Sequence, residues 1–521
     1  MTGLSLAHSP VYRSVTRATL WPLSGCLTRA RGRVHRLLFV SVLYVLVSLL
    51  AGSGVASLQR AGKGPVEAIR RENARPGTPA WKLEQAPGRS IEGYASEVSV
   101  VPGQRLHLHV STTPRAAYRV EVYRLGWYRG AGGRLVACLP GCGSARVGAS
   151  FAVPPPDPST GLVRAGWPVT DVVSTGNWVS GYYLAELVLA SGKYAGRGGW
   201  VPFIVRAAPA RPSTMLVVAS VNTWQAYNSW GGRSLYWNHT GIGDNHVSFD
   251  RPYDPAGLPT AGGPARPTAP VPQTWELPLV HFLEREGYDV SYTTDVDVDR
   301  DPSELARHRL VLTAGHSEYW TKAMRDGFER ARDQGTNLAF MGANTGYWQV
   351  RYADDRRTIV EYRNATADPE PDVLTKTVRF RDLVPPRPEC ELLGVQFGEI
   401  GFADYAPAPG ALRDPWFAGT GFTASSVLPG LVGGEYDSIT ESCNTPALTD
   451  LFHYAGHNHA NADAVRYTAP SGARVFSTGS LLFSWGLDPT TGHGDPRLQR
   501  FMRNAFTDLT HTNPHPSRTH G

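Results

Sequence analysis

A histidine and a glutamate two residues apart follow directly on a short apolar run between Leu310 and Trp320. The run ends at Gly315, and the next residues include His316 and Glu318. In an extended backbone, residues i and i+2 point the same way, so both side chains can enter one space beyond a strand. Ligands of open α/β sheets bind just beyond the carboxyl ends of strands. The segment therefore predicts half of an active site.

Two further apolar runs are followed by polar side chains of interest. Two tyrosines come after the run Met215–Ala219, and an asparagine comes after the run Asn337–Met341. Adjacent parallel strands deliver their loops to one edge of a sheet. The residues expected to meet there are Tyr227, Tyr236, His316, Glu318 and Asn344.

Two phenols and a carboxylate offer only hard oxygen donors, which suit a highly charged cation such as Fe³⁺. Tyr227, Tyr236 and Glu318 would leave positions open for water and substrate, as Lewis-acid hydrolysis requires. His316 would then carry protons, and Asn344 would orient a group or stabilise an oxyanion. The alternative is structural: the tyrosines pack under a loop, His316 caps the helix that follows, and Glu318 lies in the first turn of that helix. The residue types alone leave both readings open.

Composition narrows the class of protein. Of 521 residues, 55 are Gly and 41 are Pro, which favours strands, turns and long loops over helical bundles. The net charge of +6 equals the six arginines between Arg13 and Arg36. The remainder has no basic stripe with interleaved aromatic residues, so we expect no nucleic-acid partner.

The N-terminal region and the cysteines indicate export. Those arginines precede an apolar run at 37–51 and then small residues, so 1–57 is predicted to be a signal peptide or an N-terminal membrane anchor. Either leaves the rest of the protein outside the cytoplasm, secreted or anchored to the cell membrane. Beyond this leader the cysteines form an even set, which predicts two disulfides in an exported chain. They are Cys138, Cys142, Cys390 and Cys443.

The remaining pattern predicts a two-domain β plus α/β protein. Short alternating runs over 91–206, with no helical stretch, predict an antiparallel β-sandwich. Strands alternating with helices over 213–511 predict a doubly wound parallel sheet. The sandwich strands are expected at 95–100, 105–110, 118–123, 182–189 and 200–205, and the second domain's main elements at 215–219, 278–286, 290–293, 310–313, 321–334, 337–341 and 474–478.

Less regular segments connect these parts. Polar residues at 58–90 predict a flexible linker, 207–212 a hinge, and 512–521 a disordered tail. The interval 385–470 is loop-rich and is expected to fold over the sheet. The alternating acids Asp295, Asp297 and Asp299 lack the glycine and terminal glutamate of a calcium loop, so we interpret them as a solvated loop. Three histidines could bind a metal but are interpreted as an exposed polar loop; they are His453, His457 and His459.

Several strings resemble the large subunit of N,N-dimethylformamidase and its relatives. They are Tyr123–Gly130, Ala226–Asn228, Ser234–Tyr236, Arg251–Tyr253, Gly315–Trp320 and Gly342–Asn344. The resemblance implies a β-sandwich followed by a glutamine-amidotransferase-like domain and a mononuclear iron that serves hydrolysis of a formamide C–N bond. By motif position it implies Tyr227, Tyr236 and Glu318 as iron ligands, with His316, Asn344 and a further glutamate, Glu435, as catalytic residues.

The leading interpretation is therefore an exported or membrane-tethered hydrolase of linear amide-type C–N bonds, with Fe³⁺ as cofactor and a small amide as substrate. A homo-oligomer is compatible with the sequence. The rival interpretation is a non-catalytic cell-envelope protein whose aromatic clefts bind polysaccharide or a partner protein. Other hydrolase templates fit poorly, since no Gly-x-Ser-x-Gly elbow and no phosphate-binding glycine loop occurs.

Overall fold

The computed structural model describes residues 65–208, 212–236, 243–254, 275–441, 443–456 and 460–511. The predicted leader 1–57, part of the predicted hinge, His457, His459 and the tail 512–521 lie outside these ranges. Within the described ranges, no helix combines the length and the apolar character needed to cross a membrane.

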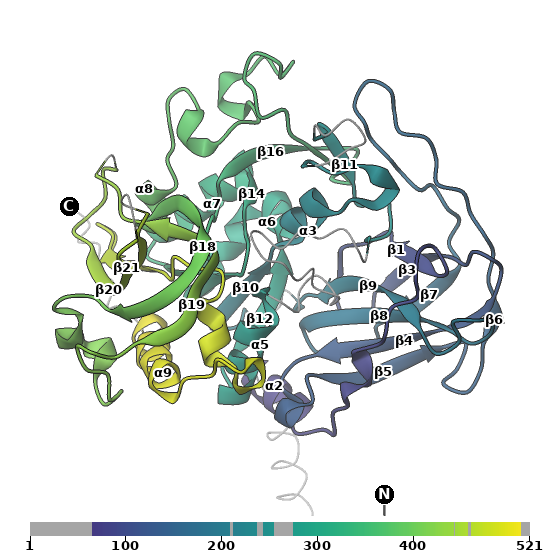
Figure 1. Ribbon diagram of the computed structural model, residues 1–521, viewed down its shortest axis with the longest axis horizontal. Coiled ribbons are helices and arrows are strands. Elements are labelled where there is room, and N and C mark those ends of the chain that lie inside the picture. The colour runs from purple at the N-terminus through teal and green to yellow at the C-terminus, as the bar shows by residue number, and fades with distance from the viewer. Residues whose placement is uncertain are drawn as a thin grey trace, which may run out of the picture. The chain divides into compact units, whose positions relative to one another are not determined.

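The N-terminal region contains two sheets (Figure 1). Side chains of both sheets lie in one hydrophobic core. One sheet has the order β1-β3-β7, and the other has the order β2-β9-β8-β4-β5, with β6 paired to β4. The alternating Leu106 and Leu108 of one sheet lie in the same core as Val120 and Val122 of the other. The strands are β1 (Glu92–Ala95), β2 (Ser99–Val100), β3 (Arg105–Ser111), β4 (Ala117–Leu125), β5 (Gly133–Leu139), β6 (Arg146–Val147), β7 (Asp171–Ser174), β8 (Gly181–Leu189) and β9 (Gly198–Val205).

Two predictions for this region need correction. The single strand expected at 95–100 is two strands, because β1 pairs with β3 in one sheet and β2 pairs with β9 in the other. The predicted linker 58–90 contains, in its described part, helix α2 (Pro65–Asn73) and the 3₁₀ helix η1 (Pro79–Trp81). Some of the polar residues that favoured a linker are buried. One of them, Asn73, accepts a hydrogen bond from the Tyr128 backbone N–H.

The C-terminal region is built on five parallel strands in the order β12-β10-β13-β15-β22. The chain enters at β10, adds β12 on one side and then adds the other strands on the opposite side. The order therefore reverses at β10 and β13, the topological switch point where ligands bind in such sheets. The strands are β10 (Met215–Ala219), β12 (Val290–Thr294), β13 (Leu310–Ala314), β15 (Asn337–Met341) and β22 (Arg474–Ser477), within one or two residues of the predicted ends.

Helices cover both faces of this sheet (Figure 1). Val217 and Leu312 point into a cluster with helices α5 (Leu277–Glu286) and α9 (Pro496–Thr510). Their neighbours Leu216 and Val311 point into a second cluster with helix α7 (Lys322–Asp333). Successive side chains of each strand thus point alternately to two layers of helices, one on each face, as in a doubly wound sheet.

The acids expected in a solvated loop instead form helix α6 (Asp295–Arg300). The Thr294 side chain caps this helix by accepting the backbone N–H of Asp297. Asp295 and Asp297 are buried. The capping threonine before the run was the helix-start signal that the alternation of acids obscured.

The interval 385–470 continues the sheet instead of folding over it. Four strands extend the parallel sheet beyond β22 in the order β21-β20-β18-β19, with antiparallel pairing throughout (Figure 1). They are β18 (Gln396–Pro407), β19 (Leu428–Ser438), β20 (Thr449–Tyr454) and β21 (Ala462–Thr468). β18 and β19 contain glycines and exposed positions, so their sequences lack the alternation of apolar and polar residues that identifies a strand.

The other described α-helices and strands are short. A four-stranded sheet contains β11 (His246–Ser248), β14 (Tyr319–Thr321), β16 (Trp348–Ala353) and β17 (Thr358–Val360). The remaining α-helices are α3 (Val221–Tyr227) and α8 (Cys390–Leu393). Disulfides join Cys138 to Cys142 and Cys390 to Cys443, as predicted from the even cysteine count.

A buried ion pair joins the two regions at the segment Tyr123–Gly130. Arg124 of β4 is fully buried, and its Nη1 and Nη2 lie 3.0 Å and 2.6 Å from the two carboxylate oxygens of Glu284 on α5. The Tyr128 hydroxyl donates to Glu72 of α2 at 2.8 Å. This segment therefore holds β4, α2 and α5 together.

Candidate active site

The two tyrosines lie on a short helix and the loop that returns to it. Helix α3 begins directly after β10, and Tyr227 is its last residue. The backbone N–H of Leu235 donates to the carbonyl of Ala226 at 3.0 Å, which brings Tyr236 back beside Tyr227. The two rings stack with centroids 4.3 Å apart.

His316 and Glu318 follow β13, as predicted, and the turn depends on two glycines. Gly315 has a φ of 60°, in the left-handed region that favours glycine. Gly342, beyond the neighbouring strand β15, lies so close that a Cβ atom on it would be 1.8 Å from the Gly315 carbonyl oxygen. Thr223 of α3 accepts the backbone N–H of Glu318 at 3.0 Å. These contacts fix the loop of Glu318 against the helix of Tyr227.

Three oxygen-bearing side chains converge at this edge of the sheet. The Tyr227 hydroxyl donates to Glu318 Oε2 at 2.8 Å, and the Tyr236 hydroxyl donates to Glu318 Oε1 at 2.6 Å. The two hydroxyl oxygens are 3.1 Å apart. Glu318 is buried, so both of its oxygens are satisfied by these two phenols away from bulk solvent.

A second group of side chains borders this cluster. His316 Nε2 lies 3.2 Å from Glu318 Oε2 and 2.9 Å from Glu435 Oε2, without the angle of a directed hydrogen bond to either. Asn344 donates through Nδ2 to Glu435 at 2.7 Å, and its backbone N–H donates to Asp437 at 2.8 Å. Asn344 itself has a φ of 50°, an uncommon backbone conformation for a residue other than glycine. Glu435 comes from β19, so the strand that sequence patterns missed completes the site.

Burial and charge set the protonation states of these groups. Burial, with the charge of Glu318, raises the pKa of both Tyr227 and Tyr236 well above the usual value of a phenol. Burial alone would lower the pKa of His316, but the carboxylates of Glu435 and Glu318 raise it to about 9. Burial opposes ionisation of Glu435, but the nearby charge of His316 and the hydrogen bond from Asn344 lower the pKa of its carboxyl.

The donor set fits a single cation of high charge. The three oxygen pairs are 2.6–3.1 Å apart, and oxygen ligands about 2.0–2.2 Å from one ion lie roughly 3 Å from each other. A cation that binds among them takes the place of the two phenol protons, which reverses the effect of burial on the tyrosine pKa. Phenolate and carboxylate oxygens are the donors that Fe³⁺ prefers.

Three further residues at the site were not predicted from the sequence. The Tyr319 hydroxyl donates to the Tyr236 hydroxyl, and Arg363 donates to the Tyr319 hydroxyl at 3.1 Å. The Arg363 guanidinium also lies 4.3 Å from the centroid of the Tyr236 ring. Asp437, the third residue, accepts the backbone N–H of Asn344. The spacing of Asp437 from Glu435 on one strand was a usable signal, since i and i+2 share a face, whereas no sequence pattern marks Arg363.

The chain belongs to the family described as N,N-dimethylformamidase beta subunit-like, C-terminal, whose model matches residues 119–496. That range includes each of the residues that meet at the candidate site. The resemblance stated from the sequence motifs is therefore confirmed at the level of the family.

Two similar proteins are named N,N-dimethylformamidase beta subunit. The N,N-dimethylformamidase beta subunit of Paracoccus aminophilus is 24% identical over 402 residues, which covers 62% of this chain and 52% of the relative. The beta subunit of an Alcaligenes species is 32% identical over 94 residues, which covers 17% of this chain and 12% of the relative. The chain thus spans about half the length of the first relative and less of the second. Among solved structures, the mmIFT52 N-terminal domain aligns with a TM-score of 0.27 at 12% identity over 44% of this chain and 88% of its own, too low to bear on the fold.

Proposed function

We propose that this protein hydrolyses linear amide-type C–N bonds with a mononuclear Fe³⁺ held by Tyr227, Tyr236 and Glu318. The observation that carries the proposal is the contact of both phenol hydroxyls with one buried carboxylate, at 2.8 Å and 2.6 Å. Two relatives named for dimethylformamide hydrolysis support the substrate class, a small linear amide. When bound, the ion supplies a Lewis acid that polarises a carbonyl and makes water more acidic.

The protein's own residues would move the protons. Glu435 is held ionised by His316 and Asn344, so it serves as the general base that takes a proton from the attacking water. His316, whose pKa is raised to about 9, holds a proton at neutral pH and passes it to the nitrogen of the departing amine. The water oxygen bonds to the carbonyl carbon, the C–N bond breaks, and the products are a carboxylic acid and an amine.

Asn344 would act by orientation. Its Nδ2 group donates to Glu435, and its Oδ1 has no hydrogen-bond partner among the described residues although it is shielded from solvent. A buried amide oxygen of this kind can accept a hydrogen bond from a water or from the N–H of a substrate. Asn344 thus aligns the base with the reacting groups.

The finer architecture and location belong to the same proposal. The shared core of the two N-terminal sheets supports a β-sandwich at 91–206, and the strand order supports a glutamine-amidotransferase-like domain at 213–511. The apolar run at 37–51 and the two disulfides support an exported or membrane-tethered protein, since disulfides persist in oxidising compartments.

Metal analysis with absorption spectroscopy tests the central claim. The purified chain should contain one iron and show a visible tyrosinate charge-transfer band, and it should hydrolyse dimethylformamide or a related linear amide. Tyr227→Phe and Glu318→Ala should lose the band and the iron, whereas Glu435→Gln should keep both and lose hydrolysis by at least about 100-fold. A colourless protein without iron would favour the rival, a non-catalytic envelope protein.

A further inference from the structure

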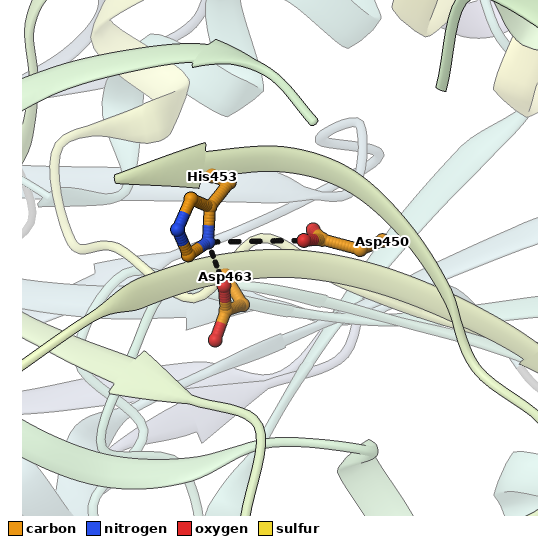
Figure 2. Close-up of side chains that lie close together, drawn as sticks. All are labelled: Asp450, His453 and Asp463. Atoms are coloured by element: carbon orange, nitrogen blue, oxygen red, sulfur yellow. Dashed lines mark hydrogen bonds and ion pairs between the residues drawn. The ribbon is translucent and has the colours of Figure 1, made fainter. Parts of the chain in front are cut away.

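A second group of metal-ligating side chains lies on the antiparallel extension of the sheet, away from the residues of the proposed iron site. Figure 2 shows Asp450 and His453 of β20 beside Asp463 of β21. His453 Nδ1 is 2.6 Å from Asp463 Oδ1 and 3.8 Å from Asp450 Oδ2. One ligand atom from each of the three residues lies within 4.8 Å of the others.

A β-bulge produces this grouping. Residues 450 and 453 of a regular strand would point to opposite faces, because side chains alternate with a period of two. In β20, however, Asp450 pairs with Val465 and Phe452 pairs with Ala464, so Leu451 is an extra residue on that strand. Below the bulge His453 lies directly opposite Asp463. The extra residue therefore turns Asp450 to the face of His453 and Asp463, and bulges commonly re-aim a side chain in this way.

One carboxylate oxygen of this group has no other partner. Asp450 Oδ1 is shielded from solvent and has no hydrogen-bond partner among the described residues. A buried polar atom without a partner is uncommon in proteins and often marks an ion or a water. Asp450 and Asp463 both approach the same nitrogen of His453, so a cation bound among the three would interact favourably with both carboxylates. His453 and Asp450 are each partly exposed, which leaves an approach from solvent.

We propose that Asp450, His453 and Asp463 bind one divalent transition-metal ion, with Zn²⁺ as the fitting cation. One imidazole nitrogen and two carboxylate oxygens suit Zn²⁺, which accepts three protein ligands and a water, whereas Mg²⁺ and Ca²⁺ prefer oxygen alone. The site shares no residue with the proposed iron site and does not depend on it.

The position of the site gives the ion a structural role. The second oxygen of Asp463 accepts the backbone N–H of Ile439 at 2.8 Å, one residue beyond the end of β19. A bound ion would therefore fasten the β20–β21 pair to the end of the strand that carries Glu435. We expect Zn²⁺ to stabilise the protein without being required for hydrolysis.

Titration of Zn²⁺ into the tag-free, metal-stripped full chain, followed by calorimetry and thermal unfolding, tests the site. The native chain should bind one more equivalent of Zn²⁺ than Asp450→Asn or His453→Gln, and Zn²⁺ should raise its Tm while leaving the Tm of these variants unchanged. Glu318→Gln, altered at the iron site, should keep this equivalent and its Tm shift. His493→Gln, altered at an exposed histidine, should do the same.

Three results would overturn the proposal: no Zn²⁺ bound by the native chain, full stoichiometry in both Asp450→Asn and His453→Gln, or equal shifts of Tm with Ca²⁺ and Zn²⁺. Circular dichroism of the variants without metal separates loss of the site from loss of the fold. The conservative Asp450→Asn change leaves the His453–Asp463 pair in place, so it provides a folded comparison.

Discussion

The candidate site contains residues whose pKa values are shifted in opposite directions from their usual values. Burial raises the pKa of the two phenols, while the neighbouring histidine and asparagine keep Glu435 ionised. Titratable groups whose pKa values are shifted in opposite directions are typical of sites that perform acid–base chemistry. The residues beyond the three proposed ligands then determine how well each of them is oriented.

Tyr319→Phe tests one of those outer contacts. Its hydroxyl donates to Tyr236, and a hydrogen bond to a phenolate draws electron density from the oxygen. Without it, the tyrosinate charge-transfer band of the iron-loaded protein should move to longer wavelength, and the free energy of unfolding should fall by about 1 kcal/mol. Tyr352→Phe is the control, because its hydroxyl donates to Asn222 at 2.6 Å instead. An unchanged band in Tyr319→Phe would mean that the Tyr319–Tyr236 hydrogen bond does not affect the proposed iron–tyrosinate bond.

Glu276 gives a pH dependence that does not involve the site. It is buried before α5, where Trp224 Nε1 donates to it at 2.6 Å and Tyr182 also donates. Burial raises its pKa from 4.5 to about 8 despite these hydrogen bonds. The folded state therefore keeps a proton that the unfolded state has released, so this contribution to stability is present below pH 4.5 and is lost as the pH rises to 8.

Glu276→Gln should remove that dependence. At about 1.4 kcal/mol per pH unit, the contribution that the native chain loses between pH 5 and 8 is at most about 4 kcal/mol. Denaturant titration at each pH measures the free energy of unfolding. As the pH rises from 5 to 8, the value for the variant should increase relative to the value for the native chain. Parallel curves for the two proteins would show that Glu276 is ionised throughout.

At the scale of elements, strand ends decide whether the site forms. The alternation of apolar runs predicted β10, β13 and β15 closely, and the switch-point rule predicted that Tyr227, Glu318 and Asn344 would meet. Local patterns could not predict that β18–β21 extend the sheet, because that pairing depends on partners distant in sequence. The placement of Glu435 came from family resemblance alone.

Gly342→Ala tests the close approach of β13 and β15. The new Cβ would lie 1.8 Å from a backbone oxygen of Gly315, so the two loops must move apart. We expect a loss of about 1–3 kcal/mol in unfolding free energy, a fall in iron content and at least tenfold slower hydrolysis. Gly143→Ala, where a Cβ meets nothing within 4 Å, should change stability by less than about 0.5 kcal/mol. Native iron content and rate in Gly342→Ala would show that the loops tolerate the displacement.

At the scale of the whole molecule, the two predicted domains share a single hydrophobic cluster. Tyr182 and Leu184 of β8 belong to the same cluster as Val217 of β10 and Leu279 of α5. Domain pairs with small polar interfaces move independently, whereas a large apolar interface joins them. The site lies in the C-terminal region, and helix α3, which carries Tyr227, contacts β8 through Trp224 and Tyr182. Glu276, just before α5, and Glu284, on α5, contact Tyr182 and Arg124 of the N-terminal sheets.

The buried pair of Arg124 and Glu284 lets this coupling be measured. Arg124→Ala leaves Glu284 buried without its cation, which should cost about 3–5 kcal/mol of unfolding free energy. Because both regions depend on the pair, calorimetry should show one unfolding transition in the native chain and one at lower temperature in the variant. Arg307→Ala removes an exposed pair with Asp301 and should cost less than about 1 kcal/mol. Two separate transitions, with only the earlier one shifted by Arg124→Ala, would show instead that the N-terminal sheets and the C-terminal region fold as independent units.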